Sequence, residues 1–116
     1  MEKRQYIRFS VIMDALCRTG ESKKKMKVDN VSKEGVGLVS RESFEEGQNV
    51  ELEMMIPGDN IPVIFEGEVA WTNTPGYDSS QYKSGVKFTK ISNEDKSRMQ
   101  EYIYQRWIMP ASAEAK

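Results

Sequence analysis

Apolar and polar residues alternate along most of this chain, and a period of two is typical of a β-strand with one face in a core. In the segment from Phe9 to Cys17 every odd-numbered residue is apolar. Turns rich in glycine and proline separate this segment from five others, at a spacing that favours a small barrel or sandwich. The predicted strands are 9–17, 24–31, 35–40, 50–54, 63–71 and 82–89.

The period changes near the C-terminus. Met99, Ile103 and Trp107 recur every four residues, which is the spacing of one face of an amphipathic α-helix. Ser92 stands in the position of an N-cap, with an acidic residue three positions later as in a capping box, and Pro110 would stop the helix. The sequence therefore predicts one helix after the last strand.

Composition excludes several classes of enzyme. The 116 residues contain no histidine and a single cysteine, Cys17. A Ser-His-Asp or Cys-His active site, a His-ligated zinc site and an internal disulfide cannot be built from them. A length of 116 residues suits one domain with its own core. We expect no enzymatic activity, no cofactor and no metal site.

Charge is divided unevenly along the chain. Residues 1–41 hold ten Lys and Arg against five Asp and Glu, a balance of +5, whereas residues 42–116 have a balance of −6. A long nucleic acid favours a broad basic face, but a small anion needs only a local cluster. The run Lys23-Lys24-Lys25 has no interleaved aromatic residue and is interpreted as a solvated hairpin end. We therefore expect a small anionic ligand and no DNA or RNA.

The sequence shows no secretion signal, because Asp14 interrupts the first apolar run too early. No apolar stretch approaches the roughly 20 residues that span a bilayer. These features predict a cytoplasmic protein without membrane insertion.

Two short motifs carry candidate chemistry. Arg4-Gln-Tyr-Ile-Arg8 is an RxxxR motif, and Asn30-Val-Ser32-Lys-Glu-Gly35 is an NxSxxG motif after the second predicted strand. In this order they resemble the PilZ domain, whose pattern is RxxxR before the first strand and [D/N]xSxxG after the second. Further positions also resemble the family over residues 3–108: Leu38, Gly67-Glu-Val-Ala-Trp71 and Gly85-Val-Lys-Phe88.

The resemblance implies a mainly β fold, a six-stranded antiparallel barrel with a C-terminal α-helix, that acts as a receptor for the bacterial second messenger cyclic di-GMP. Such a receptor would change conformation on binding and signal to a separate partner protein. A ligand-independent PilZ-like interaction adaptor is the alternative. The expected organisation is a single PilZ-like domain over residues 1–116, with a flexible ligand-binding segment at 1–8, a helix at 92–109 and a frayed tail at 110–116.

The resemblance assigns ligand binding to Arg4, Arg8, Asn30, Ser32 and Gly35. A guanidinium can fork onto a phosphate or a guanine and can also stack on a base. Asn30 and Ser32 share a face if this stretch is extended, and their oxygens would accept from a guanine edge. Gly35 would provide either a positive φ or a close backbone approach.

Asn30 and Lys3 depart from the family pattern, and Trp71 has two interpretations. Asn30 replaces the commoner Asp, and one amide oxygen accepts more weakly than a carboxylate. Asp29 is not expected to substitute, because one step along a strand turns a side chain to the opposite face. Lys3 stands where many members carry Arg, and it is a candidate contact that bears on whether one or two ligand molecules bind.

Periodicity places Trp71 and Trp107 in the core, although Trp71 is also a candidate for the border of the site.

Overall fold

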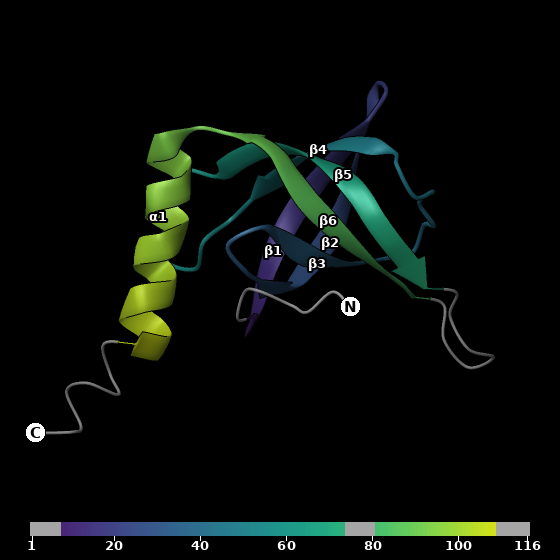
Figure 1. Cartoon of the computed structure of the whole chain (residues 1–116). Coiled ribbons are helices and arrows are strands. Elements are labelled where there is room, and N and C mark those ends of the chain that lie inside the picture. Colours follow the sequence, from purple (N-terminus) through teal and green to yellow (C-terminus); the bar gives the residue numbers. More distant parts are fainter. Residues whose placement is uncertain (1–7, 74–80, 109–116) are drawn as a thin grey trace, which may run out of the picture.

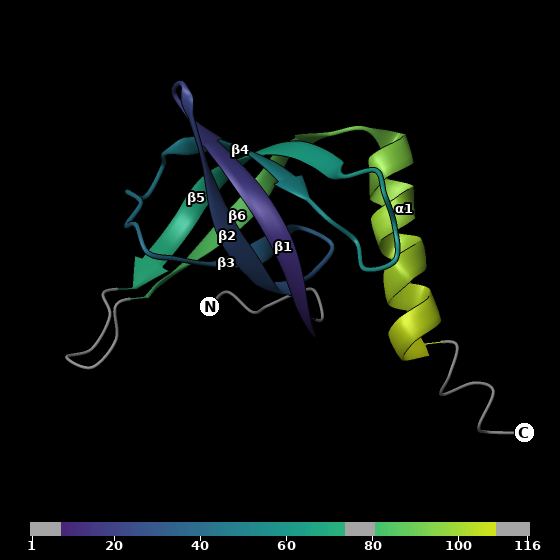
Figure 2. The same ribbon diagram turned by 180° about the vertical axis from the view of Figure 1, so that it is seen from behind.

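Six strands close into an antiparallel barrel in the order β1-β2-β3-β6-β5-β4, in a computed structural model that describes residues 8–73 and 81–108. The helix α1 stands beside one end of this barrel (Figures 1 and 2). The chain is therefore mainly β, and the predicted fold class is confirmed. The elements are β1 (Phe9–Thr19), β2 (Ser22–Val31), β3 (Gly35–Ser40), β4 (Asn49–Met54), β5 (Val63–Asn73), β6 (Tyr82–Ile91) and α1 (Asn93–Ile103).

The barrel interior is filled by the apolar residues of the alternating strands. In β1 the buried residues are Val11, Met13, Ala15 and Cys17, as the period of two predicts. Phe65 of β5 belongs to the same core, and its ring meets that of Phe88 edge to face, with centroids 4.8 Å apart. Because the apolar side of each strand fills the interior, the polar side is left to form the outer face.

The helix begins where the sequence predicts. Ser92 is the N-cap, and its hydroxyl oxygen accepts a hydrogen bond of 3.1 Å from the backbone N–H of Asp95. Met99 and Ile103 are buried against the barrel. The helix continues as a π-helical segment, η1 (Tyr104–Ile108). The side chain of Trp107 and the predicted end of the helix at 109 with its tail lie outside the described residues.

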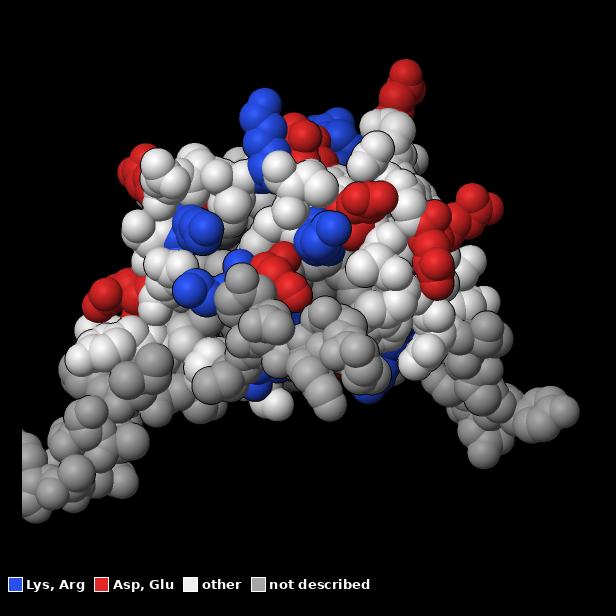
Figure 3. Space-filling view, in the orientation of Figure 1, with Lys and Arg blue, Asp and Glu red and all other residues white. Residues whose placement is uncertain are grey.

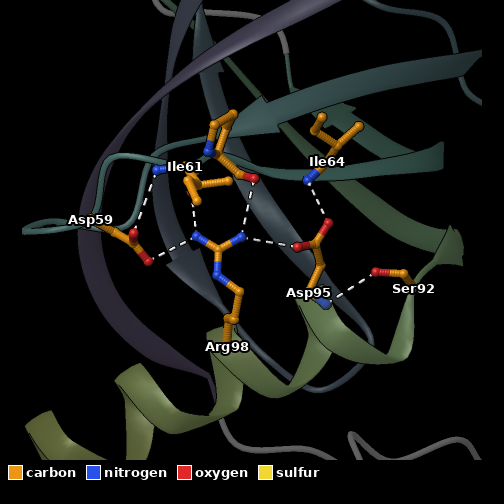
Figure 4. Close-up of polar contacts among 7 residues, drawn as sticks. Asp59, Ile61, Ile64, Ser92, Asp95 and Arg98 are labelled. Atoms are coloured by element: carbon orange, nitrogen blue, oxygen red, sulfur yellow. Dashed lines mark hydrogen bonds and ion pairs between the residues drawn. The ribbon is translucent and has the colours of Figure 1, made fainter.

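Polar contacts hold α1 to the loop between β4 and β5, which reaches the helix in Figures 1 and 2 and is enlarged in Figure 4. Arg98 Nη2 lies 2.8 Å from Asp59 Oδ2 and also donates to the carbonyl oxygen of Ile61. Arg98 Nη1 lies 3.0 Å from Asp95 Oδ1. The other Asp95 oxygen accepts from the backbone N–H of Ile64 at 3.2 Å, so this carboxylate joins the helix to the barrel. We call Asp59, Asp95 and Arg98 the helix clamp.

Candidate functional site

A β-bulge in β2 directs two polar side chains to the same side of the strand. Val28 pairs with one residue of β3 and Asn30 pairs with the next residue of β3, so Asp29 is an extra residue on β2. Val28 and Val31 are both fully buried, which leaves Asp29 and Asn30 together on the outer face. The expectation that Asp29 faces away from Asn30 is therefore wrong, because it assumed an unbroken period of two.

A series of contacts between side chains crosses the outer face at this bulge. Arg8 Nη1 donates a hydrogen bond of 2.8 Å to Asn30 Oδ1. Asn30 Nδ2 in turn donates a hydrogen bond of 2.7 Å to Asp29 Oδ1. Lys83 Nζ of β6 lies 3.8 Å from Asp29 Oδ2. The Asn30 amide thus lies between a guanidinium and a carboxylate, and that carboxylate in turn lies near the ammonium group of Lys83.

Two paired glycines lie beneath the side chains of this series of contacts. Gly37 of β3 pairs directly with Gly85 of β6. A Cβ on Gly37 would overlap Asn30 Nδ2 and would lie 2.7 Å from Asp29 Oδ1. A Cβ on Gly85 would overlap the indole nitrogen of Trp71. The Cα atoms of paired strand residues are about 4.5–5.5 Å apart. The side chains of Asp29 and Asn30 over Gly37 therefore lie next to the indole of Trp71 over Gly85.

The indole is on the outer face because β5 also carries a bulge. Val69 pairs with Val86 and Trp71 pairs with Gly85, so β5 has one residue more than β6 between these pairs. Val69 is buried, whereas Trp71 is 38% exposed. The prediction of a core position for Trp71 is wrong, since the extra residue turns the indole outward. Its other interpretation, a residue that borders a ligand site, stays a prediction.

Ser32 and Gly35 hold the turn between β2 and β3. Ser32 is 1% exposed, and its Oγ accepts from the backbone N–H of Glu34 at 3.2 Å and donates to the carbonyl oxygen of Gly35 at 3.4 Å. A Cβ on Gly35 would overlap the backbone carbonyl oxygen of Val86 on β6, and its φ is not positive. Gly35 thus provides a close backbone approach to a neighbouring strand. Ligand contact stays a prediction for both residues.

Of the predicted site residues, the structure brings together Arg8, Asn30 and the candidate Trp71. Arg4 and Lys3 lie outside the described residues, as does the predicted flexible segment up to residue 7. Sequence reasoning missed Gly37 and Gly85 as a pair. A glycine inside an apolar strand is the available signal, because it often marks a close approach of another group.

Acidic and basic residues are interspersed over the face of the molecule seen in Figure 3. Several lysines of the basic N-terminal third have acidic partners: Lys27 Nζ lies 2.6 Å from Asp14, and Lys23 Nζ lies 2.9 Å from Glu53. Within residues 8–73 and 81–108, no cluster of acidic or cysteine side chains is arranged to hold a metal ion. None of the helical segments described there is long and apolar enough to cross a membrane.

A cavity of about 570 Å³ is lined by residues of β1, β2 and β3 together with Glu53, Met55 and Gln81. Its lining includes Lys27, Val39 and Arg41. Val39 pairs with both Lys27 and Lys83, so the cavity borders the Asp29–Lys83 contact. Neither Asn30 nor Trp71 lines it, and the two regions are therefore distinct.

The chain matches one family model, and its fold is similar to those of several solved structures. A family model described as the PilZ domain matches residues 2–105. No curated protein matches the chain. The PilZ domain of YcgR from Escherichia coli, solved with c-di-GMP, matches over 99% of each chain with a TM-score of 0.71 and 14% identity.

Two longer proteins are also similar. The inhibitor of motility MotI/DgrA from Bacillus subtilis has a TM-score of 0.75 and 21% identity over 91% of this chain and 51% of its own. PlzA from Borreliella burgdorferi, solved in complex with c-di-GMP, has a TM-score of 0.65 and 15% identity over 86% of this chain and 40% of its own. This chain therefore spans about half of MotI and less of PlzA, and the likeness at these identities is one of fold.

Proposed function

This chain belongs to the PilZ domain family, and from that premise we propose that it is a receptor that binds cyclic di-GMP on the outer face of the barrel, between Arg8 and Trp71. The observation that carries the proposal is the arrangement over Gly37 and Gly85, where a hydrogen-bonding pair lies beside an exposed indole. The c-di-GMP in the structures of YcgR and PlzA supports this class of ligand.

Each part of the arrangement matches one part of the ligand. Cyclic di-GMP has two guanines and two phosphates. The exposed indole of Trp71 offers a π face to a guanine, and stacking of a base on an aromatic ring contributes about 1–3 kcal/mol. Asn30 Oδ1 is an acceptor for guanine N–H groups. Arg8 is within 2.8 Å of Asn30, where its guanidinium can turn to a phosphate or to guanine O6 and N7.

The receptor's signalling is the finer part of the proposal. Contacts of Arg4 and Lys3 with the ligand would fix the N-terminal segment against the barrel, and a separate partner protein would recognise this changed surface. The proposed location is the cytoplasm, where a second messenger acts. Backbone NMR relaxation across Met1 to Ile7, with and without cyclic di-GMP, tests the change. Identical order parameters in the two states would contradict it.

Isothermal titration with two cyclic dinucleotides tests the ligand itself. Cyclic di-AMP is the matched control, because it has the same two phosphates but adenine lacks the guanine O6 and 2-amino group. We expect saturable binding of cyclic di-GMP and at least 10-fold weaker binding of cyclic di-AMP, since a site with buried or fixed polar groups rejects a base that leaves them unpaired. Binding of neither ligand would favour the ligand-independent adaptor.

A further inference from the structure

We propose that Asp29 and Asn30 together recognise one guanine edge of the ligand, with Asp29 providing the carboxylate that this chain lacks at position 30. The inference rests on the proposed function and adds a specificity-determining residue to it. Neither the RxxxR motif nor the NxSxxG motif includes Asp29.

Asn30 cannot satisfy a guanine edge by itself. The Watson–Crick edge of guanine presents two donors side by side, N1–H and N2–H, and needs two acceptors. Asn30 has one acceptor atom, Oδ1, and its Nδ2 is a donor that would oppose the guanine N–H groups. That Nδ2 is directed to Asp29 Oδ1 at 2.7 Å, while Oδ1 accepts from Arg8 at 2.8 Å. Asn30 alone therefore covers one of the two donors.

Asp29 lies where it can provide the second acceptor. The bulge places its carboxylate on the same face as the Asn30 amide, and the hydrogen bond between them fixes their relative orientation. A carboxylate has about four lone-pair positions. One accepts from Asn30, and Lys83 Nζ lies 3.8 Å from the other oxygen on a side chain that is 61% exposed. Acceptor capacity on Asp29 thus remains beside the Asn30 amide.

The backbone around Asp29 and Asn30 holds the two side chains in place. Val28 and Val31, on either side of it, are both fully buried, so the backbone of the bulge is anchored in the core. On β3, the missing side chain of Gly37 is the space that Asn30 Nδ2 and Asp29 Oδ1 occupy. A pair of acceptors held in this way can discriminate between bases, because its orientation is set before the ligand arrives.

The contact between Asp29 and Asn30 determines the effect expected of the Asn30→Asp substitution on ligand binding. A carboxylate at position 30 would stand beside Asp29 where a donor stands now, and two carboxylates at this distance repel each other. The substitution that restores the commoner family residue is therefore expected to weaken binding in this chain. Exchange of the two residues, Asp29→Asn with Asn30→Asp, keeps one amide and one carboxylate in contact and is expected to restore binding.

Isothermal titration with cyclic di-GMP compares the wild type, Asp29→Asn, Asn30→Asp and the double variant. We expect each single variant to bind roughly 10- to 100-fold more weakly, as for loss of a hydrogen bond to a charged group, and the double variant to bind within about 5-fold of the wild type. Asp14→Asn is the matched control. It removes the same charge from the outer face of the barrel, where Asp14 pairs with Lys27, and should leave the affinity unchanged.

The inosine analogue cyclic di-IMP, which lacks the 2-amino group, identifies the guanine contact. The wild type should prefer cyclic di-GMP over cyclic di-IMP, and Asp29→Asn should lose most of this preference. Wild-type affinity for cyclic di-GMP in Asp29→Asn, or tighter binding, would overturn the role of Asp29 alone. A wild-type protein that binds no cyclic di-GMP would instead overturn the proposed function and this inference with it. Thermal unfolding of each variant checks that the barrel is intact.

Discussion

The guanidinium of Arg98 on α1 and the carboxylate of Asp59 before β5 form an ion pair of 2.8 Å between residues 39 positions apart in the chain. Arg98 is also bonded to Asp95 and to the carbonyl oxygen of Ile61, and its side chain is 23% exposed (Figure 4). One side chain of the helix thus joins it to a loop of the barrel through several charged or backbone groups.

Arg98→Ala is expected to lower the free energy of unfolding by about 1–2 kcal/mol, because it removes several hydrogen bonds to charged and backbone groups at a partly exposed site. Urea denaturation measures the change. Arg18→Ala is the control: Arg18 pairs with Glu51 at 3.5 Å, and its side chain is 45% exposed. Its substitution should change the free energy of unfolding by less than about 0.5 kcal/mol. Equal effects of the two variants would contradict the special role of Arg98.

The helix clamp also predicts a pH dependence. The hydrogen bond from Arg98, followed by that from the backbone N–H of Ile61, holds the pKa of Asp59 below its ordinary value of 3.8. Such a carboxyl stabilises the fold above its unfolded pKa, and the contribution is lost as the pH falls through the folded pKa. Urea denaturation at steps between about pH 5 and pH 3 should therefore show a smaller loss of stability in Asp59→Asn than in the wild type. Parallel curves would argue against a lowered pKa.

Gly35→Ala and Gly85→Ala should differ in their effects, although the two glycines lie on neighbouring strands of the barrel. The new Cβ of Gly35→Ala would meet the backbone carbonyl of Val86, and a backbone shift should cost about 2–3 kcal/mol. The new Cβ of Gly85→Ala would meet the indole of Trp71, which can rotate away at a cost of about 1 kcal/mol or less. Urea denaturation ranks the two variants, and cyclic di-GMP affinity should fall in Gly85→Ala. Equal stability losses would contradict this distinction.

Arg8→Ala should reduce cyclic di-GMP affinity about 30- to 150-fold and leave the fold intact, because a contact between a charged donor and the ligand is worth roughly 2–3 kcal/mol. Isothermal titration measures the loss, with Arg18→Ala as the control, because Arg18 lies near the far end of β1 whereas Arg8 directly precedes this strand. Arg4→Lys is expected to be harmful as well, since an ammonium lacks the planar fork of the guanidinium. Wild-type affinity in Arg8→Ala would remove Arg8 from the site.

Cys17 offers a probe of unfolding. The side chain is fully buried, and burial, followed by the nearby charge of Glu42, raises the pKa of the thiol to about 11. Because the thiolate is the reactive form, a thiol reagent at pH 8 should label the native protein very slowly and the urea-unfolded protein rapidly. Fast labelling under native conditions would show that β1 opens locally.

The residue pattern predicted all six strands, and where it alternates cleanly, as in β1 and β4, it also predicted the inward residues, because each strand of a closed barrel has one face in the core. The N-cap at Ser92 was also readable, since capping depends on neighbours in the sequence. The two errors, at Asp29 and Trp71, both lie at β-bulges. A bulge is set by the number of residues on the partner strand, and a local period of two carries no information about that number.

A signal for one bulge was nevertheless present. Val28 and Val31 are apolar residues three positions apart in a segment that otherwise alternates, and both are buried. Such a spacing indicates an extra residue between two inward positions. The helix clamp had no comparable signal, because nothing near Asp59 in the sequence points to Arg98. Contacts between distant elements therefore required the structure.

Closure of the barrel has a consequence for how a partner protein can recognise it. Each of the six strands has a neighbour on both sides, so the backbone N–H and C=O groups in the paired registers are already used. A partner therefore cannot readily add a strand of its own at those positions, which is the mode by which many peptides join an open sheet. The partner proposed above would then have to recognise outward side chains, a loop or the helix. Substitutions of the outward side chains, scanned strand by strand, would test whether that surface lies on the barrel wall.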